Sequence, residues 1–378
     1  MRVGVFAPYL ETYGGGEKYI CRIASQLSRK WDVEFMVFRI PNISQLERRM
    51  NVQLGKVLFR RIEKTYSPIH IPLLGRFAEL RGISSKTGDY DLFLNQENNT
   101  LIPSLASKSV HVCQLPERDF GANRIFLPLP RNWVDAELRT YQQIITYSCF
   151  NREHIKKWFP EKKISVLYPP IDVDQFIPLP KKPIILSVGR FFAGGHCKKQ
   201  LEMIRVFKGL CNCPQGLAGW QYHLVGGVGA TASSQRYFNR CVAEAKGFPV
   251  YFHPNVSFGE LRRYYGESQI FWHATGMGES EGVHPERMEH FGMTTAEAMS
   301  AGCVPIVIDE GGQPEIVRDC VDGFLWNTIE DLKRQTLMVA DDEHLRESMA
   351  ESSVSRSREF DNGKFVERVE KIFSDLAI

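Results

Sequence analysis

The sequence contains no uninterrupted apolar run close to the roughly 20 residues that a membrane-spanning helix needs. We also expect no signal peptide, because the chain goes directly from Met1 into the strand-like segment 2–7. Its nine cysteines are scattered singly apart from Cys211 and Cys213, without the paired spacing of a zinc site. These absences predict a cytoplasmic protein with reduced thiols and without a bound metal ion.

Neither sign of charge dominates the chain, whose net charge is +3, but its two parts differ. Residues 1–170 carry 25 Lys and Arg against 16 Asp and Glu, a net charge of +9. The remainder carries 22 against 28, a net charge of −6. A basic half indicates an anionic partner, such as phospholipid, a lipid-linked diphosphate or nucleic acid.

Strand-like and helix-like segments alternate along all 378 residues, a length that suits two domains of about 150 to 200 residues. This alternation predicts an α/β protein with two doubly wound parallel sheets, which bind ligands at the carboxyl ends of their strands. We place the first domain at 1–175 and the second at 176–355. A C-terminal helix at about 356–378 is expected to pack back on the first domain.

Residues 46–66 combine six basic side chains with apolar residues between them. We interpret this segment as a basic helix, which could lie on an anionic membrane surface. The alternative is a solvated helix with one face on the core. For any single residue the solvated helix is the preferred interpretation, whereas the charge of the first half favours membrane contact for the segment as a whole.

Two acids, Glu289 and Glu297, lie eight residues apart with Gly292 between them. On one straight helix their directions would differ by about 80° and they would lie two turns apart, which is poor geometry for a shared ligand. Gly292 can take backbone angles that other residues avoid, and Thr294 with Glu297 has the form of a capping box. We therefore expect Glu289 on a loop and Glu297 in the first turn of a helix that ends near Gly302. The N-terminus of that helix favours an anionic phosphate.

The loop 13–17 places three glycines between a predicted strand and a helix predicted over 17–28, the opening of a nucleotide-binding fold. Two interpretations stay open, a ligand-binding loop and a tight turn. The G-x-G-x-x-G spacing is absent, and so is a ribose-binding acid about 20 residues later, which makes a nicotinamide oxidoreductase a poor alternative.

Five short motifs follow one another along nearly the whole chain. They are Gly14-Gly15-Gly16-Glu17, Tyr168-Pro169-Pro170-Ile171-Asp172, Ser187-Val188-Gly189-Arg190 with Lys198, Glu289-x7-Glu297 and Gly311-Gly312-x-Pro314-Glu315. In this order they resemble the retaining glycosyltransferases of family 4, which have the GT-B fold of two facing Rossmann-like domains. The Glu-His-Phe-Gly form of the acidic motif is similar to transferases that act on lipid-linked or polysaccharide acceptors, including mannosyltransferases of polysaccharide biosynthesis.

The resemblance implies a role for each matching residue. Arg190 and Lys198 would hold the donor diphosphate, where charge develops on the departing nucleotide. Residues 193–197 lengthen the spacing between them, which leaves Lys199 as the alternative to Lys198. Glu297 would accept hydrogen bonds from the ribose hydroxyls, and Glu289 would contact the transferred sugar. Backbone N–H groups near the sugar or the diphosphate would come from Phe291, Gly292, Met293 and Thr294, with Gly15 and Gly16 across the cleft.

One position departs from the family pattern. Many relatives place a histidine near the reacting sugar where this sequence has Gln114, followed by Leu115 and Pro116. His111 lies three residues earlier and would face the other side of a strand, so it could not simply substitute. Either Gln114 acts as a neutral hydrogen-bond partner or the alignment shifts, and we favour Gln114. The family uses fixed cations in place of a metal ion, so we expect neither a metal nor a cofactor.

These features together predict a retaining hexosyltransferase. The donor would be a nucleotide-diphosphate sugar held mainly by the second domain, GDP-mannose as the first choice, with UDP-glucose or UDP-N-acetylglucosamine next. The acceptor would be a hydroxyl of a glycan or a lipid-linked molecule on the basic first domain, and nucleic acid is not an expected partner. The alternative is a non-catalytic GT-B subunit of a membrane-associated assembly. We expect a cytoplasmic location, with peripheral contact on the inner face of the plasma membrane.

Overall fold

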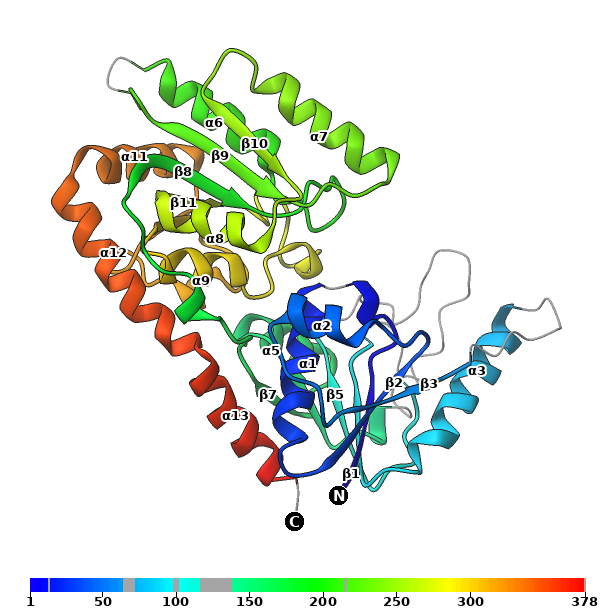
Figure 1. Cartoon of the computed structure of the whole chain (residues 1–378). Helices are drawn as coiled ribbons and strands as arrows, with labels where there is room; N and C mark the ends of the chain where they lie inside the picture. The colour runs from blue at the N-terminus through cyan, green and yellow to red at the C-terminus, as the bar shows by residue number, and fades with distance from the viewer. Residues whose placement is uncertain (13, 64–71, 98–101, 116–137, 214–215, 377–378) are drawn as a thin grey trace. The chain divides into compact units, whose positions relative to one another are not determined.

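The computed structural model (Figure 1) describes residues 1–378 except 13, 64–71, 98–101, 116–137, 214–215 and 377–378. The chain forms two compact units. The first comprises Met1–Tyr147, Asn151–Tyr168 and the residues from Val366 onward, and the second comprises Ser148–Phe150 and Pro169–Phe365. No helix in the described part of the chain is both long enough and apolar enough to cross a bilayer.

The first unit is built on a seven-stranded parallel sheet with the strand order β3-β2-β1-β4-β5-β6-β7. Its central strands are buried along almost their whole length, as expected where helices cover both faces of a parallel sheet. The strands are β1 Arg2–Phe6, β2 Asp32–Val37, β3 Leu58–Arg61, β4 Leu92–Asn95, β5 Lys108–Val112, β6 Gln143–Thr146 and β7 Lys163–Val166, and the helices are α1 Gly15–Leu27, α2 Ile43–Met50, α3 Pro72–Thr87 and α5 Cys149–Trp158.

The second unit has a six-stranded parallel sheet with the order β10-β9-β8-β11-β12-β13. In Figure 1, α6 and α7 lie on one face of this sheet and α8 and α9 on the other. The strands are β8 Lys182–Val188, β9 Gln221–Gly226, β10 Val250–Pro254, β11 Ser268–His273, β12 Val304–Ile308 and β13 Phe324–Trp326, and the helices are α6 Gln200–Cys211, α7 Ala232–Glu244, α8 Phe258–Glu267, α9 Met293–Ser300, α10 Gln313–Ile316, α11 Ile329–Asp341 and α12 Glu343–Ser357. The last helix, α13 Asn362–Ser374, begins in this unit and continues in the first.

The core of the second unit lies between β8, β11 and β12 and the helices against them. All five residues of β12 are buried, and the ring of Trp272 on β11 is fully enclosed. Its indole nitrogen is also satisfied, donating to Thr336 Oγ1 over 3.1 Å. The central strands are therefore rigid supports for the loops at their carboxyl ends. The predicted α/β fold with two doubly wound parallel sheets is confirmed.

The basic helix predicted over residues 46–66 is wrong. The helix α2 ends at Met50, because Asn51 takes the left-handed conformation with φ of 49°. Leu58, Phe59, Arg60 and Arg61 then form the edge strand β3, paired with β2. Residues 64–66 lie outside the described part of the chain. The described residues 46–63 are thus divided between the end of a helix, a connecting loop and an edge strand, and do not form a single amphipathic helix.

The last helix, α13, crosses from the second unit to the first. Val369 and Phe373 are buried, and Glu370 accepts a hydrogen bond of 3.2 Å from Gln26 Nε2 on α1. The first unit is therefore discontinuous in sequence, since its final helical turns come from the end of the chain.

Candidate functional site

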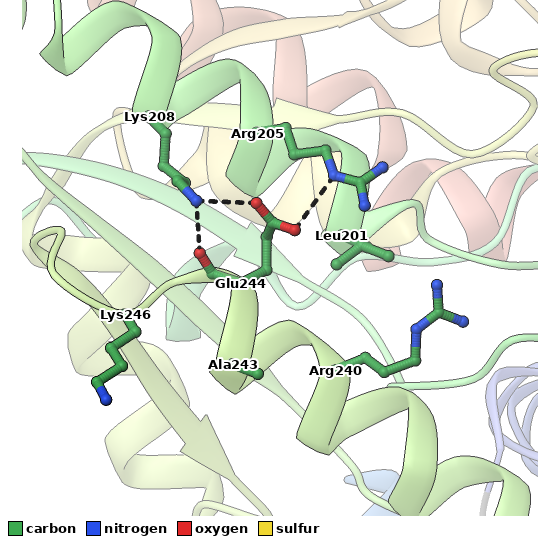
Figure 2. Close-up of a pocket in the computed structure, with 7 residues that line it drawn as sticks. All are labelled: Leu201, Arg205, Lys208, Arg240, Ala243, Glu244 and Lys246. Carbon is green, nitrogen blue, oxygen red and sulfur yellow. Dashed lines mark hydrogen bonds and ion pairs between the residues drawn. The ribbon is translucent and has the colours of Figure 1, made fainter.

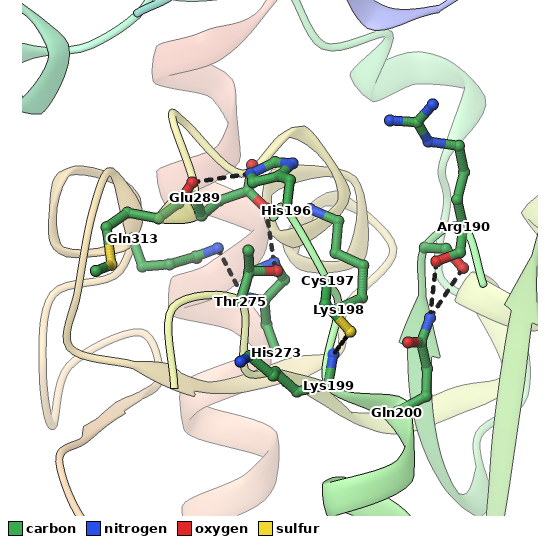
Figure 3. Close-up of polar contacts among 12 residues, drawn as sticks. Arg190, His196, Cys197, Lys198, Lys199, Gln200, His273, Thr275, Glu289 and Gln313 are labelled. Atoms are coloured by element: carbon green, nitrogen blue, oxygen red, sulfur yellow. Dashed lines mark hydrogen bonds and ion pairs between the residues drawn. The ribbon is translucent and has the colours of Figure 1, made fainter. Parts of the chain in front are cut away.

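Glu289 lies at the centre of a buried polar cluster beyond the carboxyl ends of β8 and β11 (Figure 3). It follows the short turn Pro285–Arg287 and is only 8% exposed. Its Oε2 atom accepts a 2.5 Å contact from Lys198 Nζ and a 2.9 Å contact from His273 Nε2. Burial alone would raise the pKa of this carboxyl, but Lys198 and His273 outweigh it and hold the pKa well below its ordinary value. Glu289 is therefore an ionised acid at neutral pH.

Lys198 reaches Glu289 because Gly189 leaves room for its side chain. A Cβ at Gly189 would lie 2.6 Å from Lys198 Cγ, at the point where β8 ends. The neighbouring Lys199 takes a left-handed conformation with φ of 54°, and its Nζ pairs with Glu279 over 2.8 Å. The two lysines thus point to different acids, and Lys198 is the one that the structure brings to Glu289.

Arg190 does not join this cluster. Its side chain is exposed, and it makes no hydrogen bond or ion pair with any residue that the structure describes. Its backbone carbonyl accepts a hydrogen bond of 3.0 Å from Gln200 Nε2, and Figure 3 shows the guanidinium separated from the cluster around Glu289. Arg190 is therefore a cation available to a ligand rather than part of the internal network.

Gly292 turns the chain between the two acids, with φ of 109° as the N-cap of α9. Helix α9 begins at Met293, and the N–H groups of Thr295 and Ala296 donate to the carbonyl oxygen of Gly292 over 3.0 and 3.2 Å. The N–H groups of Met293 and Thr294 precede the first intrahelical hydrogen bond, as at any helix N-terminus. The predicted capping box of Thr294 and Glu297 is wrong, because the glycine holds the N-cap position and no side chain caps the helix. Phe291, just before it, is buried and anchors the loop.

Glu297 lies one helical turn into α9 rather than at its start. Its carboxylate accepts a hydrogen bond of 3.0 Å from the hydroxyl of Tyr265 on α8. The helix ends at Ser300, and Gly302 follows with φ of 72°, as the sequence predicted. Glu289 therefore lies on the loop before α9, and Glu297 lies within the helix, as the sequence predicted.

Gly311 and Gly312 fix the backbone of the acidic loop. The N–H of Gly312 donates to the carbonyl oxygen of Glu289 over 2.7 Å. A Cβ at Gly311 would lie 2.3 Å from that same oxygen, and one at Gly312 would lie 2.7 Å from Phe291 Cα. Only glycine allows this close approach of two backbone segments. The two glycines of the motif 311–315 thus support the backbone of Glu289.

Sequence reasoning missed His273, Thr275 and Gln313. His273 ends β11, Thr275 Oγ1 lies 3.2 Å from its Nε2, and Gln313 Nε2 lies 3.1 Å from its Nδ1. A polar residue at the carboxyl end of the apolar strand 270–273 was the available signal for His273. Gln313 occupies the variable position of its motif, so no pattern in the sequence pointed to it.

In the first unit, Gly15 and Gly16 form the first turn of α1, with Gly14 as its N-cap. A Cβ at Gly16 would lie 3.2 Å from Gln114 Nε2 and 3.1 Å from Gln96 Nε2. The structure therefore brings Gly16 and Gln114 together. Gln114 also accepts a 2.9 Å hydrogen bond at its backbone carbonyl from Thr146, which fixes the end of this segment.

His111 is a core residue of the first unit, only 1% exposed. Its Nδ1 lies 3.2 Å from the carbonyl oxygen of Asn95, and burial lowers its pKa to about 4. This neutral, enclosed ring is not placed to replace the family histidine at the position of Gln114. Among the described residues, no group of three or more His, Cys, Asp or Glu is arranged to hold a metal ion.

A surface pocket of about 390 Å³ lies between α6 and α7, away from the predicted site residues (Figure 2). Glu244 sits in it and pairs with Lys208 at 2.8 Å and with Arg205 at 3.3 Å. The remaining cations that line it, Arg240 and Lys246, make it a basic surface feature.

The family match and the sequence relatives concern only part of the chain. Residues 172–356 match the family model described as "Glycosyl transferases group 1". The human GDP-Man:Man(3)GlcNAc(2)-PP-Dol alpha-1,2-mannosyltransferase is 28% identical over 253 residues, 61% of this chain and 48% of that protein. An uncharacterized glycosyltransferase of Methanocaldococcus jannaschii is 35% identical over 97 residues, 25% of this chain and 28% of that protein. This chain thus spans about half the length of the human relative, or less for the others.

Solved structures share the fold over the whole chain. The Anabaena protein HepE in complex with UDP and glucose superposes with a TM-score of 0.71 at 15% identity, covering 99% of this chain and 100% of that one. Sucrose-phosphate synthase from Thermosynechococcus elongatus gives a TM-score of 0.71 at 17% identity, covering 100% and 99%. At these identities the likeness concerns the fold, and that fold is GT-B.

Proposed function

We propose that this chain, in which residues 172–356 match the glycosyl transferases group 1 family model and which has the GT-B fold, is a retaining hexosyltransferase. The donor is a nucleotide-diphosphate sugar, with GDP-mannose as the first choice because the relatives include enzymes named for GDP-mannose. The acceptor is a hydroxyl of a glycan or a lipid-linked molecule. The observation that carries the proposal is the ionised, buried Glu289 paired with Lys198 beside the N-terminus of α9.

The geometry supports a division of work along the donor. The N-terminus of α9 and the cations Lys198 and Arg190 suit the diphosphate, where negative charge grows as the nucleotide leaves. Glu297, held by Tyr265, suits the ribose hydroxyls, and Glu289 suits a hydroxyl of the transferred sugar. Gly15, Gly16 and Gln114 belong to the first unit and are proposed to approach the donor from that side.

The reaction needs no protein nucleophile. The acceptor hydroxyl oxygen forms a bond to the anomeric carbon on the face from which the diphosphate departs, and the bond from that carbon to the phosphate oxygen breaks. The acceptor proton passes to the departing phosphate oxygen. Lys198 and Arg190 stabilise the charge on that phosphate, and closure of the site would exclude water from the reacting carbon.

A donor panel followed by release of the nucleoside diphosphate tests this proposal. The purified chain is incubated with GDP-mannose, UDP-glucose and UDP-N-acetylglucosamine, each with lipid-linked and free glycan acceptors. The anomeric configuration of the product, measured by NMR, should match that of the donor. Glu289→Ala should abolish turnover in a folded protein, and a folded variant with full turnover would show that the site is misassigned.

The second candidate is a non-catalytic subunit that binds a nucleotide-sugar. Arg190, Glu289 and Glu297 are all present, which favours an enzyme. A rise in unfolding temperature with one nucleotide-sugar, without turnover across the whole acceptor panel, would favour the binding subunit.

We further propose peripheral contact with an anionic membrane at the cytoplasmic face, from the net charge of +9 in residues 1–170. Sedimentation with vesicles of neutral lipid, and with vesicles containing phosphatidylglycerol, measures this. Binding that does not depend on the anionic lipid would refute it.

A further inference from the structure

Two donors share one oxygen of Glu289, and they differ in how firmly they are held. The Lys198 side chain is 20% exposed, at the end of a flexible stem. The His273 side chain is 3% exposed and stands at the end of β11, whose backbone pairs with β12 at His273 and Val307. A ligand could therefore draw Lys198 away from Glu289 more easily than it could displace the buried His273.

The surroundings of His273 determine where its proton lies. Burial lowers its pKa, so the ring is neutral and carries one N–H. Glu289 is ionised and can only accept, which places that N–H on Nε2. Nδ1 is then an acceptor, and the amide of Gln313 donates to it over 3.1 Å. Gln313 thus donates to His273, and His273 in turn donates to Glu289.

Gln313 is fixed as firmly as His273. It is fully buried at the start of α10, immediately after the two glycines that support the Glu289 backbone. Its amide fits against Gly292, where a Cβ would lie 2.7 Å from Nε2. The position of the amide is thus set by the same turn that presents the N-terminus of α9.

We propose that His273 is a positioning residue that holds the Glu289 carboxylate in place when the Lys198 ammonium moves from Glu289 to the diphosphate of the donor. Gln313 fixes the ring in the orientation that this requires. The inference rests on the proposed function, since it assigns Lys198 two alternating partners, the acid in the empty site and the diphosphate in the loaded one.

The physical need for such a residue follows from burial. Keeping a buried carboxylate ionised without a hydrogen-bond partner costs free energy. Its pKa therefore rises, and the neutral, protonated form is favoured. His196 and His290 also lie near Glu289, but the Nε2 atom of His196 binds the carbonyl oxygen of Met288 instead, over 2.8 Å. His273 thus supplies the remaining hydrogen bond, and keeps Glu289 ionised and aimed at the sugar.

The first test observes the ring itself and requires no turnover. Nitrogen NMR on the whole chain labelled with ¹⁵N-histidine, with the resonances of His273 assigned by their loss in His273→Gln, should show a neutral ring protonated on Nε2 at pH 7. Gln313→Glu places an acceptor at Nδ1 and should give a ring protonated on both nitrogens at that pH. A wild-type ring protonated on Nδ1, or on both nitrogens, would overturn the proposal.

The second test separates positioning from a merely structural role. His273→Ala should lower kcat about 10- to 100-fold with a much smaller change in the KM for the donor, because the acid is misplaced while the nucleotide contacts remain. His273→Gln keeps an N–H and should recover most of the lost kcat. His344→Gln, an exposed histidine on α12, is the matched control and should behave as wild type.

The outcomes of the two tests distinguish the failures. If the wild type turns over no donor, the proposed function fails, while the NMR result still decides the state of His273. If the wild type is active and folded His273→Ala has the same kcat, the positioning role is refuted. If His273→Ala does not fold, Gln313→Glu takes its place: kcat should fall as His273 becomes charged, and an unchanged kcat would refute the role.

Discussion

Replacing Gly292 by alanine tests how much of the site depends on one backbone conformation. Gly292 has φ of 109° and ψ of 50° at the start of α9. An L-residue in a left-handed conformation costs about 1–2 kcal/mol. The added methyl group would also lie 2.7 Å from Gln313 Nε2 and 3.1 Å from Ile316 Cδ1.

The steric term depends on whether those neighbours can move. Gln313 and Ile316 are both fully buried, so neither can turn into solvent. Overpacking of this kind typically costs about 1–3 kcal/mol. The two contributions together predict a loss of about 2–5 kcal/mol in the free energy of unfolding of the second unit. For a unit of this size the unfolding temperature should fall by about 4–20 °C.

Thermal unfolding followed by circular dichroism measures this, and Gly209→Ala is the matched control. Gly209 lies within α6 with no atom within 4 Å of an added Cβ, so alanine there should raise stability by about 0.5–1 kcal/mol. The affinity for GDP or UDP should fall in Gly292→Ala and remain unchanged in Gly209→Ala. If Gly292→Ala unfolds at the wild-type temperature while the control rises as expected, the reasoning about this turn is refuted.

Three further predictions concern single contacts. Lys198→Ala should weaken nucleotide-diphosphate binding at least tenfold by calorimetry, and an unchanged affinity would remove Lys198 from the donor site. Tyr265→Phe should weaken nucleotide binding less than Lys198→Ala does, because it removes one hydrogen bond that orients the Glu297 carboxylate and no contact with the ligand itself; a loss as large as that of Lys198→Ala would contradict this ranking. The pKa of His111 is lowered to about 4, so between pH 6.5 and 4 the unfolded chain binds a proton that the folded chain does not, and stability falls as the pH falls through that window. His111→Phe should lose less stability between pH 7 and pH 5 in urea unfolding than the wild type does, and an equal loss would show that His111 is not the titrating group.

The alternation of strands and helices was sufficient to predict both sheets, because parallel strands buried on both faces appear as short apolar runs, such as 304–308. The same rule failed at residues 46–66. There the apolar residues fit a helix as well as a strand, and the decisive residue was Asn51, whose left-handed conformation no periodicity reveals.

The candidate site likewise contains residues that the sequence could predict and residues that it could not. Glu289 and Lys198 could be predicted because they belong to recurring motifs, and the positive φ of Gly292 followed from its place between two acids. The capping box failed because Thr294 and Gly292 compete for one N-cap, and tertiary contacts decide that competition. His273 and Gln313 lie 16 and 24 residues from Glu289 in the sequence. The contact of His273 with the acid, and that of Gln313 with His273, therefore exist only once the strands and loops of the second unit have assembled.

The discontinuity of the first unit has a consequence for synthesis on the ribosome. Its sheet emerges first, but α13 contributes the packing of Val369 and Phe373 and the contact of Glu370 with Gln26, and these residues are made only after all of 169–365. Domains usually fold in the order in which they are synthesised. Here the second unit can fold on the nascent chain before α13 has been synthesised. Until then, the apolar surface of the first unit that α13 covers remains exposed.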